Sequence, residues 1–164
     1  MSKKDEFLIV AQEISSVQKD MAKIAADMAE VIQKVLAKDA ADKLEAAYLA
    51  FQAMRFFVAA EDVLQKIAKS VDGFFPGGER SHIDLLRQMS LELPGRRPPV
   101  ISGETFEKLF ELRAFRHRLI HAYQEPLAWE RMRRPVTAVP ECAQSLSDDL
   151  TVFRGFLTRL AGNS

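Results

Sequence analysis

The sequence predicts an all-α protein, an antiparallel bundle of four main helices with short extra helices. Its apolar residues recur three and four positions apart in several long segments, and Gly- or Pro-containing breaks separate these segments. No segment alternates apolar and polar residues as a half-buried strand would, and no internal repeat is found. Helices joined by such breaks pack most simply as a bundle.

The first helix is expected over residues 4–37. Nine apolar residues alternate three and four positions apart without interruption: Phe7, Val10, Ile14, Val17, Met21, Ile24, Met28, Val31 and Val35. This heptad seam needs a facing helix, either in the same chain or in a second copy. Because the chain carries several further helices, we expect an intramolecular bundle.

A second helix is expected over residues 40–70, and Asp72-Gly73 would end it because Gly suits a left-handed cap. Around Phe51 the helix is apolar on nearly every side, which indicates two-sided burial or a protein interface. The residues expected to line its core face are Leu44, Tyr48, Phe51, Leu64, Ile67 and Val71.

Residues 73–101 are expected to be largely irregular. Ser81 and Asp84 form a potential capping pair that would open a short helix through about Met89. Within the Pro-rich turn that follows, Arg96-Arg97 is expected to be solvated, with a phosphate contact as the alternative.

Ser102 is a suitable N-cap for a helix that runs towards Tyr123 and stops at Pro126. The last helix is expected to begin near Pro140, a residue suited to a first turn, and to run to about Leu160.

Trp129 is expected to anchor residues 124–134 on the bundle, with stacking on a nucleic-acid base as the alternative.

Length and composition favour one domain over residues 1–164. The chain has 23 basic and 23 acidic residues, so we do not expect its whole surface to bind nucleic acid non-specifically. Cys142 is the only cysteine, which excludes an internal disulfide and a zinc cluster. No signal peptide or membrane span is evident, so we expect a cytoplasmic protein.

Charge is nevertheless unevenly distributed. Residues 1–95 carry 12 basic and 15 acidic residues, whereas residues 96–164 carry 11 and 8. This favours a local anionic ligand or, alternatively, an ion-pair network. Six arginines fall within residues 113–134: Arg113, Arg116, Arg118, Arg131, Arg133 and Arg134.

The side chains best suited to catalysis follow the spacing Arg116-x4-His121-x-Tyr123. A guanidinium can stabilise a phosphate, and an imidazole can move a proton near neutral pH, so phosphodiester chemistry on RNA is indicated. Five helical residues span about 140° of rotation, so Arg116 and His121 would not share a face. They could still meet if the helix loosened after Leu119, or if two copies shared a cleft around a twofold axis.

This spacing resembles the signature of HEPN-domain ribonucleases, and Tyr123 narrows the resemblance to HepT-like toxins. The polar His117 after the Arg and the apolar Leu119-Ile120 pair also fit that pattern. The resemblance implies a homodimeric helical bundle that cleaves RNA at a dimer cleft without metal or other cofactor.

The resemblance also implies roles for individual residues. His121 would be the general base or acid, Arg116 would stabilise the pentavalent intermediate, and a cyclic phosphate would be the product. His117, Arg118 and Arg113 would support Arg116 or bind RNA. A partner nucleotidyltransferase antitoxin could modify Tyr123 with AMP, which would block RNA by bulk and charge.

Alternatives remain for the same residues. Arg116 could pair with Glu107 or Glu111, and His121 could satisfy carbonyls at a helix end. The chain could be a catalytically inactive HEPN module that binds a nucleotidyltransferase or a nucleotide, or a purely structural helical protein. A metal enzyme is disfavoured because the three His and scattered carboxylates show no ligand spacing that we identify.

Overall fold

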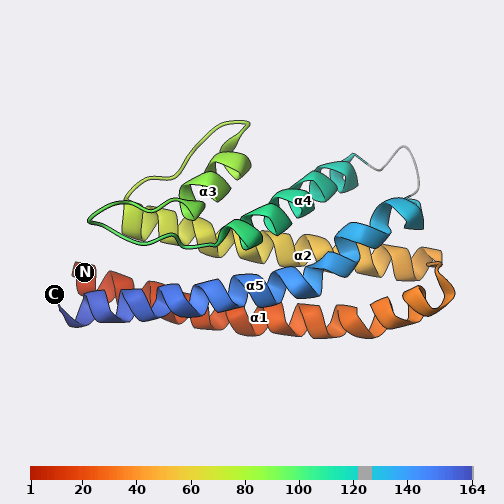
Figure 1. Cartoon of the computed structure of the whole chain (residues 1–164), viewed down its shortest axis with the longest axis horizontal. Coiled ribbons are helices and arrows are strands. Elements are labelled where there is room, and N and C mark those ends of the chain that lie inside the picture. The colour runs from red at the N-terminus through yellow and green to blue at the C-terminus, as the bar shows by residue number, and fades with distance from the viewer. Residues whose placement is uncertain (122–126, 164) are drawn as a thin grey trace.

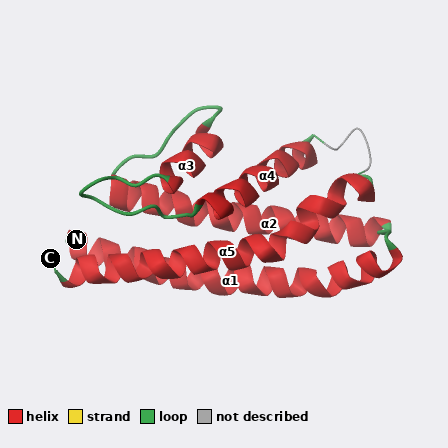
Figure 2. Ribbon diagram, viewed as in Figure 1, coloured by secondary structure: helices red, strands yellow, loops and turns green. Residues whose placement is uncertain are grey.

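The computed structural model describes residues 1–121 and 127–163. In these residues all regular structure is helical, which confirms the predicted all-α antiparallel bundle (Figure 2). The elements in chain order are α1 (Lys3–Lys38), α2 (Lys43–Ile67), the π-helical turn η1 (Ala68–Asp72), α3 (Ser81–Ser90), α4 (Gly103–Ile120) and α5 (Trp129–Gly162).

Helices α1, α2 and α5 form the long body of the molecule, and the two chain ends lie at the same end of it (Figure 1). Helices α3 and α4 lie on one side of α2, where α4 contacts α2, α3 and α5 (Figure 1). The site discussed below is at the C-terminal end of α4.

The long first helix is confirmed. A capping box opens α1, because Ser2 Oγ accepts from the Asp5 amide and the Asp5 carboxylate accepts from the Ser2 amide. The helix ends at Asp39, which adopts a left-handed conformation with φ 47°. Its heptad seam packs against α2 and α5 of the same chain, so the expected intramolecular packing is also confirmed.

The predicted core face of α2 is wrong over its first half. Leu44 and Phe51 are 82% and 63% exposed, whereas Leu64 and Ile67 are buried as expected. The buried face lies on the opposite side of the helix and includes Leu49, Ala50, Ala53, Phe56, Phe57 and Ala60. Apolar periodicity could not select between two apolar faces, and the face with small alanines is the one that the neighbouring helices approach.

The irregular segment after α2 confirms one cap and corrects another. Gly73 ends η1 with φ 85°, a conformation that favours Gly, and its amide donates to Ala68 O at 3.0 Å. The predicted Ser81–Asp84 cap is wrong, because Ser81 is already helical and Arg80 occupies the N-cap without a side-chain hydrogen bond.

Arg97 is not a solvated turn residue, and this is the largest correction in the segment. Its guanidinium forms a two-pronged ion pair with Asp72, through Nε to Oδ1 at 2.6 Å and Nη2 to Oδ2 at 2.7 Å. Both side chains are 0% exposed. Gln88 Nε2 also donates to Asp72 Oδ2 at 2.7 Å, which ties α3 into the same network.

The beginning of α4 is confirmed and that of α5 is corrected. Ser102 caps α4 by accepting from the Thr105 amide at 3.2 Å. Helix α5 begins at Trp129, well before the expected start, and both Pro135 and Pro140 lie inside it. Each proline removes a backbone hydrogen bond, but the buried side chains around them hold the helix together.

Trp129 anchors the start of α5, as expected. The side chain is 7% exposed, and its Nε1 donates to Asp39 Oδ1 at 3.3 Å. Arg133 pairs with the same carboxylate at 3.0 Å, so this end of α5 is fixed to the turn between α1 and α2.

Removing one partner of the buried ion pair is expected to destabilise the protein strongly. Asp72→Ala or Arg97→Ala would leave a buried charge without its partner, which costs about 3–5 kcal/mol of unfolding free energy. Urea denaturation followed by circular dichroism measures the change. Arg96→Ala is the control: its exposed guanidinium donates only to the Val71 and Asp72 carbonyls, at 3.5 and 3.3 Å, so its loss should cost less than about 1 kcal/mol. Equal stability for Arg97→Ala and Arg96→Ala would contradict this prediction.

The Cys142 thiol is expected to be unreactive in the folded protein. Burial raises its pKa from 9.0 to about 12, and only the thiolate attacks thiol reagents. The thiol pKa is higher in the folded protein than in the unfolded chain. Burial of the neutral thiol therefore contributes fully to the free energy of unfolding below pH 9.0, and this contribution is lost as the pH rises towards about 12. At pH 8 a disulfide reagent should react with Cys142 at the rate of global unfolding, and fast labelling of native protein would contradict the buried position.

Candidate active site at the end of α4

The last two turns of α4 carry three arginines and a histidine, and His121 follows the helix directly. Leu109, Leu112 and Phe115 bury the opposite side of α4 in the core. This burial fixes the rotation of the helix, so the polar residues lie on the side of α4 that faces away from the core. Tyr123, the proposed modification residue, lies outside the described residues.

Arg116 is held in place by an aromatic ring instead of a carboxylate. It is half-buried, and its guanidinium carbon lies 5.8 Å from the centroid of the Phe57 ring of α2. Such a contact contributes roughly 0.5–1 kcal/mol and leaves the guanidinium charge unneutralised. Arg116 Nε is buried and has no hydrogen-bond partner in the described chain.

The alternative in which Arg116 pairs with Glu107 or Glu111 is wrong for this structure. Glu111 pairs with Arg134 of α5 at 2.9 Å, and no ion pair involves Arg116 among the described residues. Within the part of the chain that the structure describes, its guanidinium charge is therefore not neutralised and is suited to an anion.

Arg113 and Arg118 likewise form no ion pair among the described residues. Arg113 is half-buried, and its Nε also has no partner among the residues that the structure describes. Arg118 is exposed and stacks on Phe115 with 5.9 Å between the guanidinium carbon and the ring centroid. By contrast, Arg133 and Arg134 of α5 are neutralised by Asp39 and Glu111. Among the described residues, Arg113, Arg116 and Arg118 of α4 therefore differ from Arg133 and Arg134 in having no ion-pair partner.

His117 and His121 lie next to each other. Their ring centroids are 4.7 Å apart and the planes meet at 60°, an edge-to-face contact. Both residues are exposed. His82, the third histidine, lies in α3, where its Nδ1 is 2.6 Å from Glu61 Oε2 of α2.

Within one chain, the structure brings His121 to His117 and not to Arg116. Helix α4 continues to Ile120, and His121 adopts φ −98° and ψ 7° without turning back. No contact between Arg116 and His121 is found in the described part of the chain, and the helical rotation of about 140° explains why. The helix does end directly after Leu119 and Ile120, but this ending does not by itself bring His121 to Arg116 in the described residues.

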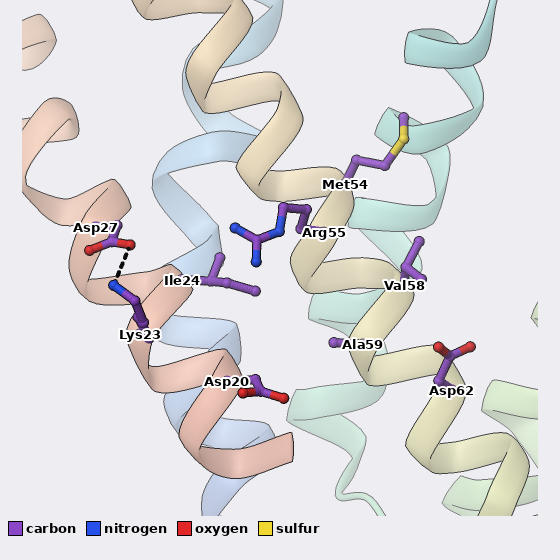
Figure 3. A pocket seen from close by; sticks show the side chains of 9 residues that line it. All are labelled: Asp20, Lys23, Ile24, Asp27, Met54, Arg55, Val58, Ala59 and Asp62. Atoms are coloured by element: carbon purple, nitrogen blue, oxygen red, sulfur yellow. Dashed lines mark hydrogen bonds and ion pairs between the residues drawn. The ribbon is translucent and has the colours of Figure 1, made fainter. Parts of the chain in front are cut away.

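A separate groove of about 510 Å³ lies between α1 and α2 (Figure 3). Asp20 and Asp62 come from its opposite walls, and Lys23 is paired with Asp27 at 3.2 Å. None of the motif residues lines this groove. Its carboxylates disfavour a polyanion, so the candidate RNA site remains at α4.

Phe57 is the part of this site that the sequence did not single out. It is far from Arg116 in the chain, and no spacing rule connects a residue of the second helix with one of the fourth. Its only signal was the dense apolar cluster around Phe51.

Comparison with known families identifies the chain. A family model described as HepT-like protein matches residues 49–157. The chain belongs to the HepT-like family. No curated protein and no solved structure gives a significant match.

The match includes every described motif residue of this HepT-like protein, together with Asp72 and Arg97. It starts within α2 and therefore leaves α1 outside, although α1 packs on both α2 and α5. The all-α bundle agrees with the HEPN class implied by the sequence resemblance. In the described residues, no helix combines the length and apolar character needed to cross a membrane.

Proposed function

We propose that this HepT-like protein is a metal-independent endoribonuclease and the toxin of a toxin–antitoxin pair, acting in the cytoplasm. The observation that carries the proposal is Arg116, a guanidinium held on Phe57 and paired with no carboxylate of residues 1–121 or 127–163. A fixed cation with free donors is suited to the charge that develops on a pentavalent phosphorus.

The proposed reaction transfers protons without a metal. His121 accepts the proton of a ribose 2′-hydroxyl as its oxygen attacks the adjacent phosphorus. The bond from phosphorus to the 5′-oxygen breaks, that oxygen takes up a proton, and a cyclic phosphate remains. Arg116 stabilises the intermediate, while His117, Arg113 and Arg118 bind the neighbouring phosphates.

A second copy would complete this site, because Arg116 and His121 of one chain do not meet. Its docking surface is proposed to be the α2 seam, which we define as Leu44, Tyr48, Phe51 and Val58. These side chains are 82%, 37%, 63% and 42% exposed and follow helical spacing on one face. Val58 directly follows Phe57, so the seam and the Arg116 contact occupy neighbouring faces of the same stretch of α2.

The partner antitoxin is proposed to be a nucleotidyltransferase that adds AMP to Tyr123. The added phosphate would carry negative charge two residues after His121 in the sequence and would compete with RNA for the arginines of α4.

Cleavage is expected to need both Arg116 and His121. Purified Arg116→Ala and His121→Ala should each lose at least about 100-fold in cleavage rate, in the presence of a chelator, because each removes charge stabilisation or proton transfer. The measurement is the appearance of cyclic-phosphate RNA ends, with growth arrest on induced expression as a parallel readout. Arg134→Ala is the control, since this exposed arginine is already neutralised by Glu111.

The same experiment tests the inactive-module alternative, which the separation of Arg116 from His121 favours. If wild type and both variants arrest growth equally and release no RNA ends, the protein acts by binding alone and the nuclease proposal is wrong.

The dimer is expected to depend on the α2 seam. Phe51→Glu should convert a particle of twice the 18.5 kDa chain mass into a monomer, because a charge would be buried at an apolar interface. Sedimentation measures the mass, and circular dichroism checks that the helices remain. Val152→Glu is the control, an exposed apolar position on α5 that is 72% exposed against 63% for Phe51. A monomeric wild type, or a dimer that both substitutions leave intact, would contradict the proposed interface.

A further inference from the structure

The histidine pair at the end of α4 has the geometry of a chelating site. His117 lies in the last turn of α4, and His121, four positions later, is the residue that caps the helix end. Their ring centroids are 4.7 Å apart. A metal ion about 2.0–2.1 Å from one nitrogen of each ring would set the ring centres roughly 4.5–5 Å apart when the two ligands are adjacent.

We infer that His117 and His121 together chelate one divalent transition-metal ion of the Cu²⁺, Ni²⁺ or Zn²⁺ class. These ions favour imidazole nitrogen, whereas Mg²⁺ and Ca²⁺ require oxygen ligands that the pair does not offer. Both residues are exposed, so an ion can approach from solvent with little rearrangement.

Two electrostatic effects oppose each other at this position. The C-terminal end of α4 carries about half a negative charge from its aligned peptide dipoles, which favours a cation. Arg113, Arg116 and Arg118 lie on the same two turns and repel one. The ions expected to bind are therefore those with the strongest bonds to nitrogen, with Cu²⁺ ahead of Ni²⁺ and Zn²⁺.

The site supplies two protein ligands, and water or an anion supplies the rest. In the described residues no group of three or more His, Cys, Asp or Glu side chains is arranged to hold a metal. Binding is therefore expected to be reversible and weaker than at a structural zinc site, which uses four protein ligands.

Metal binding would compete with proton transfer. A ring nitrogen whose lone pair is bonded to a metal cannot accept a proton, so the ion would inhibit the enzyme without being its cofactor. This consequence rests on the proposed function of His121, whereas the binding itself does not.

Calorimetric titration of untagged full-length protein with Cu²⁺ and Ni²⁺ tests the binding. We expect His117→Ala and His121→Ala each to weaken binding at least tenfold, because each removes one of two ligands. His82→Ala is the matched control, since it removes the remaining histidine, which contacts Glu61, and should leave the affinity unchanged. Full affinity in either single variant of the pair, or an equal loss in His82→Ala, would overturn the site.

Cleavage assays separate the two proposals. We expect RNA cleavage by wild type to fall as Cu²⁺ fills the site and to recover when a chelator is added. Cleavage that is unchanged by an ion shown to bind would overturn the inhibitory role. Protein that cleaves no RNA under any condition would overturn the proposed function and leave the calorimetric result standing.

Discussion

The buried ion pair between Asp72 and Arg97 determines how the second half of the bundle is attached to the first. Arg97 also donates to the carbonyls of Leu91 and Gln88, so one guanidinium joins η1, the end of α3 and the turn around Gly95. Val100 and Ile101 then donate to Met89 O and are buried just before α4 begins. The position of α4, and with it the placement of Arg116 on Phe57, depends on this connection.

The end of α4 combines features that a purely structural helix end would not need. Buried or half-buried arginines in proteins are usually satisfied by carboxylates, as Arg97 is by Asp72. Arg113 and Arg116 instead keep an Nε with no partner in the described chain, beside two exposed imidazoles in contact. We therefore expect the arginines at this end of α4 to bind an anion, and the histidines to bind a proton or a metal ion.

Local patterns were sufficient to predict the all-α bundle, the extent of α1 and the caps at Ser102 and Gly73, because these depend on neighbouring residues alone. The Arg-x4-His spacing predicted the residues of the candidate site, and their roles stay predictions. Local patterns gave wrong predictions where the neighbouring residues allowed two structures equally well. Helix α2 has two apolar faces, and the prolines of α5 are tolerated only because their neighbours are buried.

The sequence by itself determined the helical class, the positions of most helix ends and the identity of the chemical groups at the end of α4. Only the tertiary structure decided which face of α2 is buried, that Arg97 is an internal ion-pair partner, and that Phe57 lies under Arg116. These outcomes depend on pairs of residues from different elements. Burial and charge neutralisation are properties of such pairs, and a single periodic segment contains no information about its partner.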